Sequence, residues 1–153
     1  MVKYYIEEKN GFIISTNPDD IDYQKLHNFL ANDSYWSQNI PLELLKKAIS
    51  NSLSFSVLTQ DTKLFVVFAR LITDKATFAY LADVYIDSKY RGSGLGKWLI
   101  NTIMNYSEVQ GLRNWLLFTK DAHGLYEKFG WEILKDSKRA MVINRKATEL
   151  YKP

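Results

Sequence analysis

The chain contains no cysteine, which excludes a disulfide framework, a thiolate zinc site and a cysteine nucleophile. Only two histidines occur among its 153 residues, so a histidine-rich metal site is not expected. The sequence also lacks an apolar run long enough to cross a bilayer, and residues 1–10 carry no signal-peptide pattern. These absences predict a cytoplasmic protein with no bound metal and no membrane partner.

An excess of charge of either sign is also missing. Twenty basic and 17 acidic residues leave a net charge of +3, and no cluster of five or more Lys or Arg occurs. This balance argues against nucleic acid as a partner, although it slightly favours the attraction of an anionic cofactor. The length and the hydrophobic fraction of 46% fit one globular domain over residues 1–153.

Apolar spacing and turn residues predict the element order ββ-αα-βββ-α-β-α-ββ, which indicates a single α/β (α+β) domain. Three successive strands in the middle of the chain suggest an antiparallel meander, and the third is apolar along both alternating sets, as expected of a strand covered on both faces. The expected elements are strands within 3–16, helices 21–31 and 42–52, strands 54–59, 64–73 and 76–86, helix 94–107, strand 115–119, helix 122–129, and closing strands 131–134 and 140–144.

A glycine-rich loop, Arg91-Gly92-Ser93-Gly94-Leu95-Gly96, separates the apolar run 78–86 from the amphipathic run 95–106. A strand, a glycine loop and a helix start together form an arrangement that holds phosphate, because backbone N–H groups and the positive helix N-terminus point at the ligand. Glycine is needed where a Cβ would block the approach of the backbone. The loop therefore predicts a phosphate-bearing cofactor.

Two familiar phosphate motifs do not fit this loop. Lys97 stands where the dinucleotide fingerprint needs its third glycine, and Arg91 and Trp98 occupy positions that a P-loop reserves for Gly and for Ser or Thr. A simple glycine-rich turn is the alternative. Arg91 favours phosphate binding, since a guanidinium pairs with phosphate oxygens in a fork, and a bound anion would also explain Lys97 in the first helical turn.

The spacing Arg91-x-x-Gly94-x-Gly96 resembles the acetyl-CoA pyrophosphate loop of the GNAT superfamily of N-acetyltransferases. Leu125-Tyr126-x-x-Phe129-Gly130 follows at the separation typical of that superfamily, and the similarity covers about residues 76–131. The chain also looks like a bacterial subgroup of unassigned substrate. The resemblance implies a GNAT-like domain with a mixed, mostly antiparallel central sheet, helices on both faces, and acetyl-CoA as cosubstrate.

The resemblance also implies which residues hold the cofactor. Main-chain N–H groups of the loop would bind the diphosphate, and the strand before it would splay from its neighbour and bind the pantetheine arm through its backbone. A backbone N–H near Val84 would face the thioester oxygen, as an oxyanion-type donor does. The implied cofactor-binding residues are Val84, Tyr85, Ile86, Arg91, Gly92, Ser93, Gly94, Leu95, Gly96 and Lys97.

Tyr126 corresponds to the family's general acid, which protonates the CoA thiolate as it leaves. Because Ala122, Leu125 and Phe129 share a helix stripe beside it, a core tyrosine is the alternative. Asp121 is interpreted as a helix cap and His123 as partly exposed.

Asp83 is the only charged residue between Thr77 and Ile86, and a carboxylate in a central strand is costly unless it is paired or lines a cleft. We expect it to act as a base or to contact the substrate ammonium, and a carboxylate that anchors a loop is the alternative. Tyr35 and Trp36 lie where family members form the acceptor wall, and their rings could enclose an amine by cation–π contact or simply pack on the sheet.

The predicted function is the direct transfer of an acetyl group from acetyl-CoA to a small-molecule amine or to an amine of a protein or peptide. A non-catalytic acyl-CoA sensor with the same fold is the first alternative, and a nucleotide-binding domain unrelated to GNAT is the second. The resemblance is also compatible with a homodimer, since dimers are common in the superfamily.

Overall fold

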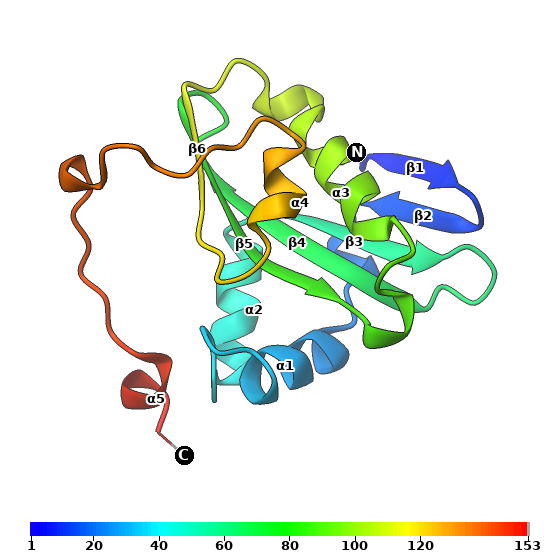
Figure 1. Cartoon of the computed structure of the whole chain (residues 1–153). Helices are drawn as coiled ribbons and strands as arrows, with labels where there is room; N and C mark the ends of the chain where they lie inside the picture. Colours follow the sequence, from blue (N-terminus) through cyan, green and yellow to red (C-terminus); the bar gives the residue numbers. More distant parts are fainter. Residues whose placement is uncertain (153) are drawn as a thin grey trace.

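Residues 1–152 are described by a computed structural model, in which all strands belong to one sheet (Figure 1). The order in the sheet is the order in the chain, and every neighbouring pair is antiparallel except the last, in which β6 runs parallel to β5. This confirms the mixed, mostly antiparallel sheet. The strands are β1 (Ile6–Lys9), β2 (Phe12–Ser15), β3 (Leu53–Thr59), β4 (Phe65–Thr73), β5 (Phe78–Ile86) and β6 (Asn114–Leu117).

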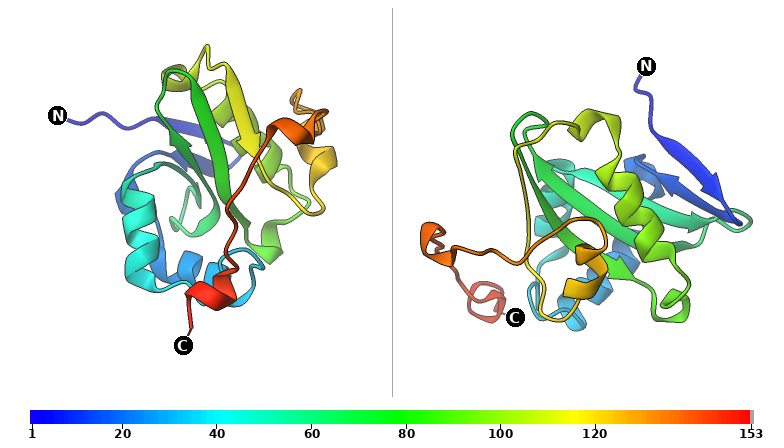
Figure 2. Two further views of the ribbon diagram at one scale, coloured as in Figure 1. Left: turned by 90° about the vertical axis from the view of Figure 1, so that its left-hand side faces the viewer. Right: turned by 45° about the horizontal axis from the view of Figure 1, so that its top comes forward.

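Helices cover both faces of the sheet, as expected (Figures 1 and 2). One face carries α1 (Tyr23–Asn32) and α2 (Leu42–Ser50), and the other carries α3 (Leu95–Met104) and α4 (His123–Glu127), while α5 (Ala147–Leu150) ends the chain. Four single turns of 3-10 helix join these elements: η1 (Pro18–Asp20), η2 (Ser88–Tyr90), η3 (Ser107–Val109) and η4 (Ser137–Arg139). Within the described residues, none of the helices has the length and apolar character needed to cross a membrane.

The core consists of two apolar clusters, one on each side of the sheet. Under α3, the stripe that includes Leu99 and Ile103 meets Phe55 of β3, and all three side chains are buried. Under α1 and α2, Leu26 and Leu45 pack with Phe68 of β4. Because both faces are covered, β4 and β5 are apolar along most of their length, which is typical of central strands.

A β-bulge interrupts the pairing of β4 with β5. Phe68 lies opposite Tyr85 and Arg70 lies opposite Ala82, so that two residues of β5, Asp83 and Val84, face only one residue of β4. Asp83 has a φ of 52°, a left-handed conformation that is uncommon for residues other than glycine. The pairing of β5 with β6 ends just before the bulge, at Leu81 and Leu117, so the two strands part at this point.

The two closing strands expected at 131–134 and 140–144 are wrong. Within residues 1–152 the chain forms no strand after β6, and residues 131–146 instead run as an extended segment with one 3-10 turn. Consecutive apolar residues such as Met141 and Val142 favour a strand, but a strand requires a hydrogen-bonded neighbour and this segment lies apart from the sheet (Figure 2). The other expected elements are confirmed, with ends displaced by a few residues.

The carboxylate of Glu7 on β1 connects the first hairpin to α3. It accepts hydrogen bonds from Tyr5 Oη (2.6 Å), Trp98 Nε1 (2.8 Å) and Thr102 Oγ1 (3.1 Å). Burial raises the pKa of this carboxyl, but the three donors outweigh burial and lower the pKa below its ordinary value of 4.5. Glu7 therefore stabilises the fold above about pH 4.5, and this contribution is lost as the pH falls through the lowered pKa.

We expect Glu7→Gln to lower the melting temperature at pH 7, because the neutral amide accepts these hydrogen bonds less strongly. The deficit should shrink as the pH falls below about 4.5, where Glu7 becomes protonated in the unfolded chain, and it should be lost once the pH has fallen through the lowered pKa of the folded protein. Thermal unfolding of both proteins between pH 7 and pH 3 measures this, and a deficit that is independent of pH would contradict the assignment.

Candidate active site

The glycine loop is shaped to present backbone N–H groups to a ligand. Gly92 and Gly94 have positive φ values of 76° and 84°, which a Cβ would strain. Gly94 is the N-cap of α3 and offers no side chain to the first-turn N–H groups of this ten-residue helix. Orphan donors at the positive end of a helix are suited to an anion, so the loop is a candidate site for one.

Gly96 allows α3 to approach the end of β5. A Cβ at this position would lie 2.9 Å from Cδ1 of Ile86, which is closer than ordinary packing permits. The side chain of Leu95 is buried in the core, so only its N–H faces the loop region. The requirement for glycine at 94 and 96 therefore has two different origins, backbone conformation at the first and close packing at the second.

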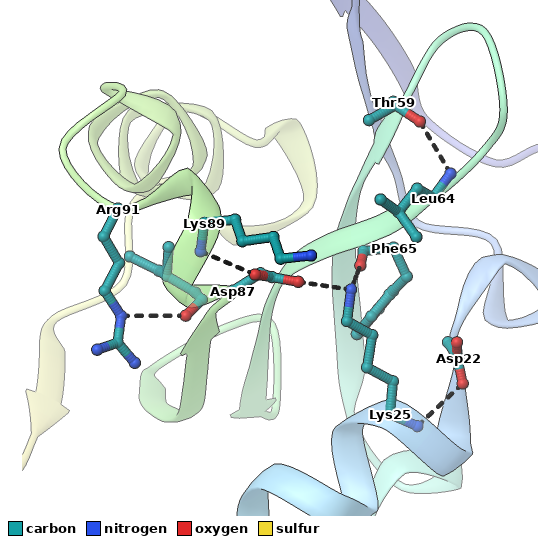
Figure 3. A network of polar contacts seen from close by, with 9 residues as sticks. Asp22, Lys25, Thr59, Leu64, Phe65, Asp87, Lys89 and Arg91 are labelled. Carbon is teal, nitrogen blue, oxygen red and sulfur yellow. Dashed lines mark hydrogen bonds and ion pairs between the residues drawn. The ribbon is translucent and has the colours of Figure 1, made fainter.

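A network of charged contacts fixes the start of this loop (Figure 3). Asp87 accepts a hydrogen bond from Nζ of Lys25 on α1 at 2.7 Å and another from the N–H of Lys89 at 2.9 Å. Nζ of Lys25 also donates to the carbonyl of Phe65 at 2.6 Å. The Lys25 ammonium lowers the pKa of Asp87, so this carboxylate remains ionised and ties the end of β5 to α1 and β4.

Arg91 follows this anchor and leans back on β5. Its Nε donates to the carbonyl of Ile86 at 3.3 Å, and the two terminal nitrogens have no hydrogen-bond partner within the described chain (Figure 3). A guanidinium held only through Nε leaves the N–H groups of its two terminal nitrogens available to a phosphate or carboxylate.

A second cation stands beside the loop. Lys97 in the first turn of α3 is close enough to Lys128, at the end of α4, to lower the pKa of Lys128. Two exposed ammonium groups repel one another, and an anion placed between them would remove this cost. Sequence reasoning missed Lys128, because the fold alone brings α4 to the N-terminus of α3.

Beyond the loop, a cavity of about 1000 Å³ opens where β5 and β6 part. Half of the expected site residues line it, whereas residues 92–97 lie outside its lining. The side chain of Tyr85 points to the opposite face and packs on Phe29 and Phe65. Only the backbone of Tyr85 is therefore available to a ligand. The expected residues along the cavity wall are Tyr35, Trp36, Asp83, Val84, Ile86, Arg91 and Tyr126.

Past Leu81, β5 has no strand paired to it on its β6 side within residues 1–152. Backbone groups on this side of Val84 and Ile86 consequently border the cavity instead of a sheet ladder. This is the splayed strand that the sequence resemblance implies. An amide-containing chain can bind to such an exposed edge as an additional strand would.

Tyr126 lies on α4 with 7% of its surface exposed, and it both lines the cavity and belongs to the core cluster under α3. Its ring meets Trp131 edge-on at 6.0 Å. Burial raises the pKa of its hydroxyl to about 12, so the group is protonated at neutral pH and serves as a hydrogen-bond donor. Tyr126 can therefore be both a packed residue of the core and a hydrogen-bond donor to a ligand in the cavity.

Asp83, at the bulge, is held by two donors. Its Oδ2 accepts from Nε of Arg70 at 2.6 Å, and its Oδ1 accepts from Nε1 of Trp36 at 2.8 Å. Arg70 in turn donates to Oγ of Ser52 at 2.9 Å. The pair is almost fully buried, so the carboxylate both stabilises the left-handed bulge and fixes the loop that carries Trp36.

Sequence reasoning missed Arg70, although a signal for it was present. Arg70 is the only charged residue of β4 and Asp83 the only one of β5, and the two strands form a hairpin. Two lone opposite charges on neighbouring buried strands are expected to pair. Aligning the two strands around their turn would have placed them next to each other.

The end of the cavity near Asp83 is aromatic. Trp36 meets Phe29 at 6.1 Å and Tyr35 at 5.0 Å between ring centroids, and Nζ of Lys120 lies 5.0 Å from the Tyr35 ring. Both expected aromatic residues are thus present at the cavity.

The expected cap of α4 by Asp121 is wrong. Ala122 is the N-cap, and its N–H donates to Oγ1 of Thr119 at 3.0 Å, because Thr119 lies closer to the turn. Asp121 instead lines the cavity, while His123 is exposed.

Comparison with known proteins agrees with this geometry. Residues 50–133 match the acetyltransferase (GNAT) domain family. A crystal structure of a candidate GNAT-family acetyltransferase from Xanthomonas campestris is 36% identical, superposes with a TM-score of 0.88, and is matched over 95% of this chain and 100% of that one. A candidate acetyltransferase of Gibberella zeae is 29% identical over 140 residues, with 78% of each chain covered.

A more distant structure shares the fold and contains the cosubstrate. The GNAT-family acetyltransferase of Elizabethkingia anophelis, solved with acetyl-CoA bound, is 16% identical with a TM-score of 0.61 over 83% of this chain and 80% of that one. Three observations lead to one assignment. The family match covers more than half of the chain, the Xanthomonas protein is similar over nearly its whole length, and the glycine loop lies beside a splayed strand. The chain belongs to the GNAT family of acetyltransferases, and it is an acyltransferase whose acetyl donor is acetyl-CoA.

Proposed function

We propose that this enzyme transfers the acetyl group of acetyl-CoA directly to the amine of a small molecule, with Tyr126 as general acid. The observation that carries the proposal is a protonated tyrosine on the wall of the cavity that opens between β5 and β6. A non-catalytic acyl-CoA sensor would have no use for a proton donor at this position.

The residues around the loop are suited to the phosphates of the cosubstrate. We assign the N–H groups of residues 92–96 to its diphosphate, together with the side chains of Arg91, Ser93 and Lys97. The like charges of Lys97 and Lys128 at the end of a helix dipole support this assignment, because they favour a strongly anionic ligand.

The free side of β5 is suited to the remainder of the cosubstrate, which supplies an activated acetyl thioester when bound. Backbone groups of Val84, Tyr85 and Ile86 would hold the pantetheine arm, and the N–H of Val84 would polarise the thioester carbonyl. The bulge supports this role, since it turns a backbone N–H out of the ladder with β4. The rigid ion pair at Asp83 keeps that N–H in place before the reaction begins.

Proton transfer at the other side of the thioester is assigned to Tyr126. Its hydroxyl holds a proton at neutral pH and would deliver it to the departing thiolate of CoA. The buried surroundings strengthen this hydrogen bond, because a low local dielectric strengthens electrostatic interactions.

The acceptor amine is assigned to the aromatic end of the cavity, against Tyr35, Trp36 and Asp83. The carboxylate of Asp83 accepts one hydrogen bond at each oxygen, which leaves further lone pairs for an amine. We therefore assign Asp83 to contact with the acceptor nitrogen, from which it accepts the proton that is lost as the amide bond forms and the C–S bond of the thioester breaks. A cavity of about 1000 Å³ is of the size that encloses small ligands, which favours a small-molecule amine over an amine on a protein surface.

Release of free CoA, measured with a thiol reagent across a panel of small amines and lysine peptides, tests the function. We expect release with small amines and little with peptides, together with a melting shift on addition of acetyl-CoA but not of ATP or NAD. A ligand at a hundred times its Kd adds about 2.7 kcal/mol to stability. Tight binding of acetyl-CoA without CoA release for any amine would contradict the proposal.

Tyr126→Phe should lower kcat by about 100-fold or more while leaving the KM for acetyl-CoA nearly unchanged, because the ring remains and only the proton donor is lost. In the wild type, a pKa of about 12 means that the donor stays protonated through the alkaline range, so Tyr126 produces no fall of kcat up to about pH 10. Steady-state kinetics of both proteins measure these effects. Unchanged turnover of the variant would eliminate the assignment.

Trp36→Phe should raise the KM for the amine severalfold with little change in the KM for acetyl-CoA, since it removes the hydrogen bond to Asp83 but retains an aromatic ring. Tyr35→Phe is the matched control, because it keeps the aromatic ring next to Trp36 and removes no hydrogen bond to Asp83. Equal effects of the two substitutions, or an effect on acetyl-CoA instead of the amine, would count against an acceptor site at this end of the cavity.

Lys128→Ala should raise the KM for acetyl-CoA about threefold to fivefold at low salt, and added salt should reduce this difference, because the interaction is between exposed charges. Lys47→Ala on α2 is the control, since this exposed lysine lies on the other face of the sheet. A variant with normal KM at every salt concentration would remove Lys128 from the cofactor site.

A further inference from the structure

The segment 142–148, near the end of the described chain, forms one wall of the cavity that opens between β5 and β6. The remainder of the lining belongs to the domain and includes the aromatic end with Asp83. Figures 1 and 2 show α5 beside the connection between α1 and α2, which carries Tyr35 and Trp36. The segment therefore faces the same space as these rings. Its lining residues are Val142, Asn144, Arg145, Lys146, Ala147 and Thr148.

Tyr151 holds this wall against the domain. Its ring packs, together with Phe29 of α1, on the core cluster under α1 and α2. The N–H of Tyr151 donates to the carbonyl of Ala147 at 2.7 Å, which closes the single turn of α5. Arg145 and Lys146 directly precede this turn, so the packing of Tyr151 determines where the two cations stand.

The cations at this end of the cavity have no carboxylate partner. Arg145 and Lys146 are exposed, and within residues 1–152 neither belongs to an ion pair. Lys120 adds a third positive charge, since its Nζ lies 5.0 Å from the centroid of the Tyr35 ring, and it too is outside the ion pairs of the described chain. Like charges gathered in this way favour a bound anion.

The acidic residues of the cavity do not balance these cations. Asp83 and Asp121 are the two carboxylates among the described lining residues. Asp83 is already paired with Arg70, with 2.6 Å between Oδ2 and Nε. Asp121 supplies one negative charge against three cations. The aromatic end of the cavity consequently has a positive potential, and a concave wall strengthens the effect of such a potential on a ligand.

Neutral hydrogen-bonding groups accompany the charges. Ser37, Gln38, Asn144 and Thr148 line the same cavity, and their hydroxyl and amide groups can donate to an oxyanion. A guanidinium with neutral donors nearby suits both carboxylates and phosphates, because it binds two of their oxygens in a fork. The lining therefore has the composition of a site for an organic anion, in addition to the loop that is suited to the diphosphate.

We propose that the acceptor is a small amine that also carries an anionic group, a carboxylate or a phosphate, and that Arg145 and Lys146 bind this group. The inference rests on the proposed function, in which Asp83 contacts the acceptor nitrogen. Asp83 lies on β5 and the two cations lie on the segment 142–148, so the acceptor is held at two positions and its nitrogen is oriented.

The same charges exclude other amines. A neutral amine leaves the cations without a partner, and a polyamine or a lysine-rich peptide brings further positive charge to a positive wall. Arg145 and Lys146 therefore determine specificity, and they have no part in the chemical step.

Matched amines test this preference. β-Alanine is compared with β-alaninamide, and O-phosphoethanolamine with ethanolamine, by the rate of CoA release corrected for the fraction of unprotonated amine. We expect kcat/KM to be about tenfold higher or more for the acidic member of at least one pair, because the neutral member lacks a charged interaction. The two pairs distinguish carboxylate from phosphate. Equal or higher values for the neutral member of both pairs would overturn the proposal.

Arg145→Gln should reduce the preference about tenfold through a higher KM for the acidic amine, with little change for the neutral amine or for acetyl-CoA. Arg145→Glu should abolish it, because the new carboxylate repels the anionic group. Arg139→Gln is the matched control, since this arginine lies earlier in the same part of the chain and outside the cavity lining. The preference compares two amines on one protein, so partial unfolding does not change it. A preference that survives Arg145→Glu would overturn the proposal.

Calorimetric titration separates this inference from the proposed function. Each amine is titrated into the protein saturated with free CoA, where no reaction occurs. Tighter binding of the acidic amines without CoA release in the presence of acetyl-CoA would support the anion site and contradict the proposed function. Release of CoA with no preference for acidic amines, in rate or in affinity, would leave the proposed function intact and overturn the inference.

Discussion

The site depends on the point where β5 parts from β6. Pairing with β6 ends at Leu81, and two residues later Asp83 adopts a left-handed conformation that bends β5 at the bulge. The ion pair of Asp83 with Arg70 and the hydrogen bond from Trp36 stabilise this uncommon backbone. β6 ends at Leu117, so the cavity and the open side of Val84 and Ile86 lie next to the bulge. A strained residue held by buried partners in this way is typical of functional sites.

The two ends of the same strand have opposite chemical character. After Ile86 the chain enters a positively charged region with a helix N-terminus, Arg91 and the pair of Lys97 and Lys128. Near Asp83 the cavity is aromatic and holds a carboxylate that is neutralised by Arg70. Under the proposed function, an elongated anionic cosubstrate would have one favourable direction along β5, with its phosphates at the loop and its reactive end near the bulge. Tyr126 from α4 lines the same cavity.

Local features of the sequence were sufficient to predict the strand–loop–helix unit and the helix that carries Tyr126, whereas the role of Tyr126 came from the family resemblance and stays a prediction. Glycines with fixed conformational needs and a helix stripe lie within a few residues of the groups that they position. Arg70, Lys25 and Lys128 were missed, because each acts on a residue far away in the chain: Arg70 on Asp83, Lys25 on Asp87, and Lys128 beside Lys97.

The closing strands were predicted wrongly for a related reason. The apolar segment 140–144 has the composition of a strand, and composition does not specify which edge, if any, a strand joins.

The central claim is that the N–H groups of residues 92–96 bind the diphosphate of acetyl-CoA and direct its thioester to the wall formed by Val84 and Tyr126. A crystal structure of the complex tests this most directly. We predict that the phosphate oxygens lie within hydrogen-bonding distance of the loop N–H groups, the acetyl oxygen faces the N–H of Val84, and the sulfur lies near the Tyr126 hydroxyl. Acetyl-CoA bound at another surface, with no contact to the loop, would contradict the account.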